Sequence, residues 1–167
     1  MIREATAADL PTIRALQHCL TEPATDLFDA LPHGVTLVST TEPAELASST
    51  AESGAQERPT TEPDARVPTA ASTSIPVGYV HAFPGEPATV TELVVEPDHR
   101  REGRGRLLLA SVLARLRREG CPAVTLTVAT ENEAAQRLYE SLGFERDATL
   151  PGFYEGGGDA YRLRRPL

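Results

Sequence analysis

The sequence of 167 residues contains no lysine, so all 16 of its basic side chains are arginines. Its two cysteines, Cys19 and Cys121, are too few for a disulfide scaffold and lack metal-ligand spacing, so we expect no metal site. No run of about 18 apolar residues is present, and residues 1–6 lack the charged-then-apolar pattern of a signal peptide. We therefore expect a cytoplasmic protein with no membrane partner.

The charge is unevenly distributed along the chain. The formal net charge is -8, which argues against a general nucleic-acid binder, because such proteins need a broad basic face. Residues 100–118 have the opposite sign, with seven arginines against the single acid Glu102. The arginines at 115, 117 and 118 also fit an ordinary solvated helix face, whereas the first four lie among glycines. A local anion site remains compatible with the acidic total.

Residues 39–76 differ in composition from the rest of the chain. They are rich in Ser, Thr, Ala, Pro and Glu and contain no aromatic residue. Such a segment buries too little apolar surface to offset its ordering entropy, so we predict that it is disordered. The residues before it are too few to fold alone. We therefore expect one domain, residues 1–167, interrupted by this insert at 39–76.

Apolar periodicity and turn residues outline alternating strands and helices in the remaining sequence. A first helix is expected to begin at Thr6, where the threonine and Asp9 form a capping pattern. Two further helices are expected at 104–119 and 132–142. We expect strands at 2–5, 35–38, 77–83, 89–95, 123–129, 144–146 and 160–164. This order predicts an α/β sheet of mixed strand direction.

The segment 100–106 joins the strand at 89–95 to the helix that follows it. Gly103 and Gly105 allow successive amides to turn inward, and the helix N-terminus adds unpaired N–H donors. With the surrounding arginines these groups predict a phosphate cradle. The absence of lysine excludes a nucleotide P-loop, and Leu108 takes the third glycine position of a Rossmann fingerprint. A purely structural turn is the alternative.

Two segments resemble the signatures of a known family. Arg100-x-x-Gly103-x-Gly105 resembles the acetyl-CoA signature of the GNAT family of N-acetyltransferases, and residues 132–144 resemble its second signature. The resemblance is close over 77–147 and loose over the first strand and helix. It implies the GNAT fold: an α/β (α+β) architecture with a mixed, mostly antiparallel central sheet, two splayed strands and flanking helices. It also implies an acyltransferase that uses acetyl-CoA as the donor.

The same resemblance implies how the cofactor binds. The pantetheine arm is expected along the backbone of 93–95, and the pyrophosphate on the amides of 101–105. Asn132 is expected to contact the arm, to cap the helix, or to do both. The predicted cofactor-binding residues are Leu93, Val94, Val95, Arg100, Arg101, Glu102, Gly103, Arg104, Gly105, Arg106, Asn132 and Tyr139.

Two residues are predicted to be catalytic. Tyr139 matches the family tyrosine that protonates or hydrogen-bonds the departing thiolate, with simple helix packing as the alternative. Glu92 is the candidate base for the amine, which must lose a proton before it attacks the thioester directly. It alternates with Leu93, so one of the two faces the cleft; a strand-surface carboxylate is the alternative. His81 is a weaker candidate base.

The acceptor is less well defined than the cofactor. In ribosomal-protein alanine N-acetyltransferases of RimI type, which the segment 138–144 also resembles, a Glu lies twelve residues before the tyrosine. Thr127 takes that position here, so we predict a small-molecule primary amine as the acceptor. Acetylation of protein N-termini or lysines, and a non-catalytic acyl-CoA-binding module, are the alternatives. A monomer or homodimer is expected. Acceptor contacts are expected at 20–34 and at Phe153, Tyr154, Glu155 and Asp159.

Overall fold

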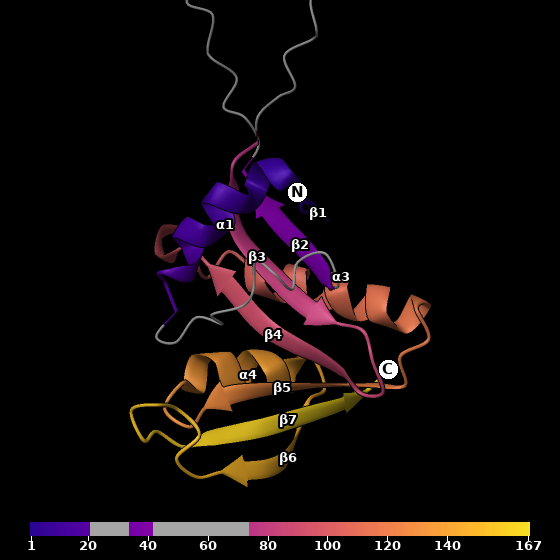
Figure 1. Cartoon of the computed structure of the whole chain (residues 1–167), viewed down its shortest axis with the longest axis vertical. Helices are drawn as coiled ribbons and strands as arrows, with labels where there is room; N and C mark the ends of the chain where they lie inside the picture. The colour runs from indigo at the N-terminus through magenta and orange to yellow at the C-terminus, as the bar shows by residue number, and fades with distance from the viewer. Residues whose placement is uncertain (21–33, 42–73) are drawn as a thin grey trace, which may run out of the picture.

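The computed structural model of this chain describes residues 1–20, 34–41 and 74–167. These residues form strands, α-helices and short 3₁₀ turns (Figure 1). The elements are β1 (Ile2–Glu4), η1 (Ala7–Asp9), α1 (Leu10–Gln17), β2 (Val35–Thr40), β3 (Pro76–Phe83), β4 (Ala88–Val95), η3 (Pro97–His99), α3 (Arg104–Arg118), β5 (Ala123–Ala129), α4 (Glu133–Ser141), β6 (Glu145–Leu150) and β7 (Ala160–Pro166).

The strands form one sheet in the order β1-β2-β3-β4-β5-β7-β6. Neighbouring strands are antiparallel at every pair except β4 and β5, which are parallel. Helix α1 lies on one face of the sheet, and α3 and α4 lie on the other (Figure 1). The predicted fold class, a mixed and mostly antiparallel sheet flanked by helices, is therefore confirmed.

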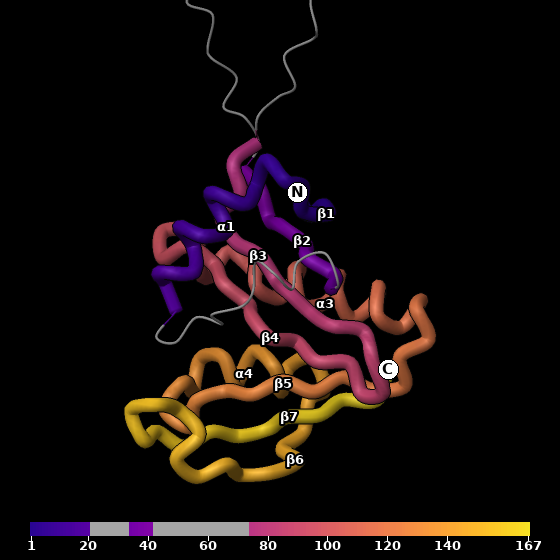
Figure 2. Tube along the Cα trace, viewed as in Figure 1, coloured from indigo at the N-terminus to yellow at the C-terminus, as the bar shows by residue number. Residues whose placement is uncertain are grey.

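Strands β4 and β5 separate after a short paired stretch. Their register joins Ala88 to Val124 and Val90 to Leu126, and it extends no further. Beyond these residues β4 pairs only with β3, and β5 only with β7, among the strands of the described chain. The two traces diverge visibly from their paired ends (Figures 1 and 2). The splayed strands that the sequence predicted are thus present, and they open a gap in the middle of the sheet.

Apolar side chains form a separate core on each face of the sheet. The larger core packs α3 and α4 against the sheet, and the smaller core packs α1 against it. In the larger core Leu108, Leu109, Val112, Leu116, Val90, Leu126, Tyr139 and Phe144 are buried. In the smaller one Ile13, Leu16, Val38, Tyr79 and Val94 are buried. Burial at roughly helical spacing explains why these segments are helices that lie flat on the sheet.

A β-bulge changes which face the side chains of β4 occupy. The register with β3 pairs Ala82 with Val90 but His81 with Glu92, so Thr91 is an extra residue in β4. Strict alternation would place Val90 and Val94 on the same face of the sheet. Instead Val90 packs in the α3 core and Val94 in the α1 core. The bulge therefore turns Glu92 toward α1.

The predicted element boundaries agree with the structure to within a few residues, with one correction. The insert predicted at 39–76 is too long at both ends, because Ser39 and Thr40 belong to β2 and Pro76 begins β3. Hydrogen bonding in the β2–β3 ladder offsets the low apolar content of these residues. The disorder predicted for the rest of the insert falls on 42–73, which lies outside the described residues. The helix predicted from Thr6 starts with a 3₁₀ turn before α1 begins.

Candidate active site

The loop between β4 and α3 presents backbone amides at the opening of the sheet. Arg101 and Gly103 both have a positive φ, of 63° and 78°, and Gly103 is the N-cap of α3. The first bond of the helix runs from Leu107 N to Gly103 O at 3.0 Å. The amides at 104–106 therefore lack intrahelical acceptors and are available to an anion, at the positive end of the helix dipole. Phosphate binding by these amides stays a prediction.

Three elements meet at Gly105 in the first turn of α3. A Cβ placed at Gly105 would lie 3.5 Å from Leu138 Cδ2 and 3.8 Å from Val95 Cγ2. Arg106 also donates from Nη1 to Ser141 Oγ at 3.0 Å. The end of β4, the start of α3 and the helix α4 are thereby joined at one place. The two sequence signatures, which are far apart in the chain, are brought together.

The arginines of this loop make contacts within the protein. Arg104 donates to Glu102 Oε2 at 2.8 Å, and to Ser39 Oγ and Thr40 O at 3.2 Å each. Arg100 donates from Nε to Val95 O at 2.9 Å. These contacts tie the loop to the ends of β2 and β4. The guanidinium groups of Arg100 and Arg104 thus hold the loop in place from outside, whereas the amides at 104–106 have no intrahelical acceptor.

The open edge of β4 fits the predicted pantetheine site. Leu93 and Val95 are half-buried and pack against the α3 core, while Val94 packs against α1. Because β5 has separated from β4 here, the backbone groups of this segment that point toward β5 have no partner strand in the described chain. An extended ligand with amide groups along its length, such as a pantetheine arm, can form hydrogen bonds to such an unpaired strand edge.

Tyr139 lies on α4 with a buried ring and a hydroxyl that makes no hydrogen bond to the described residues. The ring packs edge-on against Phe144, at 5.9 Å between centroids. Burial, with a smaller contribution from nearby Tyr154, raises the pKa of Tyr139 to about 12. Among the buried polar side-chain atoms of the described residues, only His81 Nε2 lacks a hydrogen-bond partner. The Tyr139 residue as a whole is 9% exposed.

Glu92 lies on the other face of the sheet in a hydrogen-bonded network. Its Oε2 accepts from the Tyr79 hydroxyl at 2.5 Å, and both of its oxygens accept from Gln17 Nε2, at 3.2 and 3.3 Å. The Glu92 residue is only 5% exposed. A buried carboxylate requires such donors, since an unsatisfied charge in the interior is strongly unfavourable. The strand-surface alternative for Glu92 is therefore wrong.

His81 is poorly suited to act as a base. It lies beside Glu92 in the sheet register, is fully buried, and bonds Thr36 Oγ1 through Nδ1 at 2.7 Å. Burial lowers the pKa of His81 to about 4. A group with such low proton affinity and no exposed surface is a weak acceptor for an amine proton.

Comparison with known proteins agrees with this geometry. A family model described as "Acetyltransferase (GNAT) family" matches residues 36–144. The chain belongs to the GNAT family. Membership agrees with the predicted acyltransferase class and with acetyl-CoA as its donor.

Individual relatives resemble parts of this GNAT chain. It is 36% identical over 83 residues to the [ribosomal protein bS18]-alanine N-acetyltransferase of Escherichia coli K12, covering 48% of this chain and 56% of that protein. It is 36% identical over 75 residues to N-alpha-acetyltransferase 30 of Saccharomyces cerevisiae, covering 45% and 43%. The chain thus spans about half the length of these curated relatives.

A solved structure resembles the whole chain. The crystal structure of the NatC complex bound to Gag peptide and CoA superposes with a TM-score of 0.73 at 21% identity, covering 100% of this chain and 98% of that one. At this identity the likeness concerns the fold alone. It agrees with the sheet and helix arrangement described above.

The structure describes some of the remaining residues predicted for the site, and others lie outside the described residues. Asn132 caps α4, where its Oδ1 accepts from Ala135 N at 3.1 Å. Its contact with a pantetheine arm remains a prediction. Thr127 pairs with Arg162 on β5 and β7. Most of the acceptor segment predicted at 20–34 lies outside the described residues.

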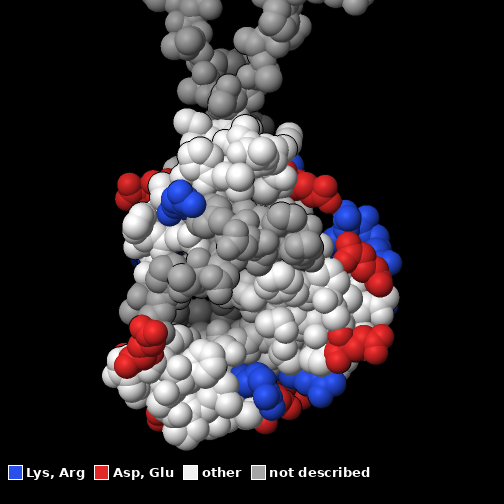
Figure 3. All heavy atoms as spheres, viewed as in Figure 1, with Lys and Arg blue, Asp and Glu red and all other residues white. Residues whose placement is uncertain are grey.

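The predicted acceptor residues of the last hairpin lie in a hydrogen-bonded turn between β6 and β7. The rings of Phe153 and Tyr154 stack edge to face at 5.2 Å, and Phe153 is exposed. Asp159 Oδ1 accepts from Gly152 N at 2.9 Å, so this acid stabilises the turn. Arg162 on β7 donates to Asp147 on β6 at 2.7 Å. On the face shown in Figure 3, basic and acidic groups lie side by side at the lower edge of the molecule.

The network around Glu92 contains the residues that sequence reasoning missed. Gln17 and Tyr79 come from α1 and β3, far from both signatures in the chain. A tyrosine two residues before His81 on the same strand was the available signal, but alternation alone did not place Glu92 on that face. The bulge at Thr91 supplies the missing step.

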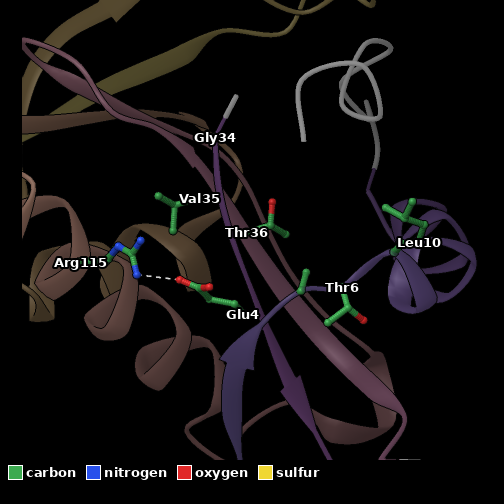
Figure 4. Close-up of a pocket in the computed structure, with 9 residues that line it drawn as sticks. Glu4, Thr6, Leu10, Gly34, Val35, Thr36 and Arg115 are labelled. Carbon is green, nitrogen blue, oxygen red and sulfur yellow. Dashed lines mark hydrogen bonds and ion pairs between the residues drawn. The ribbon is translucent and has the colours of Figure 1, made fainter. Parts of the chain in front are cut away.

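A surface pocket of about 370 Å³ lies away from the splayed strands (Figure 4). It is bounded by β1, the start of α1 and the second half of α3, where Arg115 bonds Glu4 at 2.6 Å.

The described part of the chain has no cluster of three or more potential metal ligands. It also contains no helix that is both long and apolar enough to span a bilayer.

Proposed function

We propose that this chain is an acetyl-CoA-dependent N-acetyltransferase that acts on a primary amine. The observation that carries the proposal is the opening between β4 and β5. It has the free amides of α3 at one end, Glu92 on the α1 face and Tyr139 on the α4 face. Glu92 faces α1 and Tyr139 lies in the core on the other face of the sheet, and we propose that the amine and the thioester meet between them. A cytoplasmic location remains a prediction that accompanies this function.

In the proposed reaction, acetyl-CoA supplies a thioester carbonyl that an amine attacks directly. Glu92 takes a proton from the neutral acceptor amine as the nitrogen electron pair forms the bond to the carbonyl carbon, which leaves an amide nitrogen with one hydrogen. The C–S bond breaks, and the electron pair leaves with sulfur. Tyr139 donates a hydrogen bond to this developing thiolate. The proton held by Glu92 finally returns to solvent, from which the thiolate is protonated.

The pKa of Tyr139 distinguishes between two roles for its hydroxyl. A thiol has a pKa of about 8.5, which lies below the value of about 12 for Tyr139. Complete proton transfer from this phenol to a thiolate is therefore uphill. The phenol stays protonated over the whole neutral range, so it is always available as a hydrogen-bond donor. Donation without full transfer is the role that fits this site.

The relatives favour an acceptor that belongs to a protein. By their names, one of the two relatives described above acetylates an alanine of a ribosomal protein and the other is an N-alpha-acetyltransferase. We therefore place the N-terminal amine of a peptide or protein first among the acceptors. A small-molecule amine, predicted from the sequence, is the second candidate, because Thr127 replaces the base of the RimI type.

A thiol-release screen distinguishes these acceptors. Peptides with free N-termini, the same peptides with blocked N-termini, and small primary amines are each incubated with acetyl-CoA and the full chain. The proposal predicts CoA release with the free peptides and little with the blocked ones. Faster release with small amines than with any free peptide would favour the second candidate. Tight CoA binding without release from any mixture would support the non-catalytic alternative.

A further inference from the structure

Arg104 directs its side chain away from the opening in the sheet. It is the first residue of α3, and its Nη1 donates to Ser39 Oγ and to Thr40 O, at 3.2 Å each. Both acceptors lie at the end of β2. In the strand order β2 is separated from β4 by β3, on the side of β4 that faces away from β5. The guanidinium group thus extends across β3, in the direction opposite to the opening.

The sheet leaves space for this side chain at one row of residues. Ser39 on β2 is opposite Gly78 on β3, and Gly78 is opposite Val95 on β4. A Cβ on Gly105 would lie 3.8 Å from Val95 Cγ2, so the first turn of α3 lies over the β4 end of this row. Because Gly78 has no side chain, no side chain of β3 separates Arg104 from Ser39 at this row.

Arg104 is bonded to the protein through two of its nitrogens. Besides the two bonds from Nη1, its Nε donates to Glu102 Oε2 at 2.8 Å. Ser39 is only 2% exposed, so its hydroxyl oxygen would lose this donor without gaining water if Arg104 moved away. A buried acceptor without a donor is unfavourable. The bond to Ser39 therefore keeps the Arg104 side chain on β2.

This contact restrains the backbone of the first helical turn. The amide of Arg104 is one of the three at 104–106 that lack intrahelical acceptors, because the first helical bond starts at Leu107. A side chain that is fixed on β2 limits how far its own backbone can rotate. Donors that already have the right direction bind a ligand more tightly, since less ordering is needed on binding.

We propose that Ser39 is a positioning residue for the loop between β4 and α3. Through Arg104 it fixes the amides at 104–106 in the direction in which they bind the phosphates of acetyl-CoA. Ser39 itself touches neither the phosphates nor the reacting groups. It lies 65 residues before Arg104 and belongs to neither signature. This role rests on the proposed function, in which these amides hold the cofactor.

The test is a double-mutant cycle with Ser39→Ala and Arg104→Met, followed as the Kd for CoA in calorimetric titrations of the full chain. Ser39→Ala is expected to raise the Kd about 5-fold, and Arg104→Met at least as much. The double variant is expected to match Arg104→Met, because Ser39 acts only through Arg104. A wild-type Kd in Ser39→Ala, or a further 5-fold loss in the double variant, would overturn the proposal.

Arg115→Gln is the matched control for the loss of an arginine. Arg115 lies on the same helix and bonds Glu4 and Glu119, but it makes no printed contact with the loop between β4 and α3. Its Kd for CoA is expected to equal that of the wild type. A 5-fold rise in this control as well would overturn the proposal, because any lost arginine of α3 would then have the same effect.

Steady-state kinetics distinguishes positioning from a general loss of structure. Ser39→Ala is expected to raise the KM for acetyl-CoA about 5-fold and to leave kcat and the KM for the acceptor amine unchanged. With acetyl-pantetheine, which lacks the phosphates, kcat/KM is expected to equal that of the wild type. Equal losses with both donors would overturn the proposal. If Ser39→Ala does not fold, Ser39→Cys replaces it, because a thiol is a weak acceptor; a wild-type Kd there would also overturn it.

Failure of the positioning role is distinguishable from failure of the proposed function. A wild type that binds CoA and transfers acetyl groups, together with an unchanged Kd in Ser39→Ala, would overturn only the role of Ser39. A wild-type chain that does not bind CoA would instead overturn the proposed function, and the role of Ser39 with it.

Discussion

At the scale of single residues, Tyr139 combines a packed ring with a hydroxyl that has no partner among the described residues. A hydroxyl that contributed mainly to stability would be satisfied within the fold, as that of Tyr79 is by Glu92. Leu138 and Ser141, which flank Tyr139 on α4, contact the first turn of α3, so we predict a role for Tyr139 toward a ligand.

Tyr139→Phe is expected to lower kcat by about 100-fold, because the developing thiolate loses its donor. The free energy of unfolding is expected to change by less than about 1 kcal/mol, since no internal hydrogen bond is broken. Thiol release and thermal melting measure the two effects. Tyr161→Phe is the matched control, with both quantities unchanged. Wild-type turnover in Tyr139→Phe would exclude the proposed donor.

His81 makes stability depend on pH in a predictable direction. Its pKa is about 4 in the folded chain and about 6.5 in the unfolded chain, so the unfolded state binds more protons between these values. Stability is therefore complete above pH 6.5 and falls as the pH decreases toward 4. We expect a loss of about 2 kcal/mol from this residue between pH 7 and pH 5. Urea unfolding of the wild type and His81→Asn at both pH values measures it, and equal pH slopes in the two proteins would contradict the assignment.

At the scale of elements, α3 has a glycine with positive φ at each end. Gly103 has φ +78° and precedes the helix, and Gly120 has φ +84° and follows it. A Cβ at either position would meet no atom within 4 Å, so substitution strains only the backbone. The two positions differ in one respect: only Gly103 lies in the loop that we propose binds the phosphates of acetyl-CoA.

Gly103→Ala is expected to cost about 1 kcal/mol of stability and to weaken CoA binding about 5-fold, because relief of the strain moves the loop amides. Gly120→Ala is expected to cost the same stability with no change in the Kd for CoA. Calorimetric titration with CoA and thermal melting provide the comparison. An equal loss of CoA affinity in both variants would mean that the loop has no special role.

The elements show which parts of the site were predictable from the sequence. The loop and α4 were predictable because glycine spacing, arginines and a capped helix form local patterns that need no partner. The environment of Glu92 was not, because it depends on the bulge at Thr91 and on Gln17, which approaches from another element. Alternation left Glu92 and Leu93 as equal candidates for the cleft. The register with β3 shows only that Glu92 faces α1 and Leu93 faces α3.

At the scale of the whole molecule, the alternation of strands and helices predicted the sheet and the family resemblance predicted its opening. The ends of the insert were misplaced, because composition reports the average of a segment while strand pairing acts residue by residue. Ser39 and Thr40 are buried in β2 although they are polar, and Arg104 bonds both of them. The chain enters and leaves the insert at adjacent points, since Thr41 N donates to Ile75 O at 3.2 Å.

This adjacency makes the insert a test of domain organisation. Replacing residues 42–73 by a short glycine linker is expected to leave the melting temperature and the CoA Kd close to those of the full chain. A variant with a glycine-serine linker of the original length is the control for chain closure. Failure of the shortened protein to fold or to bind CoA, with the control intact, would contradict a single domain with a dispensable insert.

The most direct test of the account is a single-turnover experiment with the chain in excess over isotope-labelled acetyl-CoA and a free-amine acceptor. Because the chain has no lysine, label on the protein itself is easily interpreted. Direct attack through the opening between β4 and β5 predicts that label passes to the acceptor amine without accumulating on the protein. It also predicts that Glu92→Gln and Tyr139→Phe slow this step while still binding CoA. Label that accumulates on the protein before it reaches the acceptor, or bound CoA with no transfer in the wild type, would contradict the account.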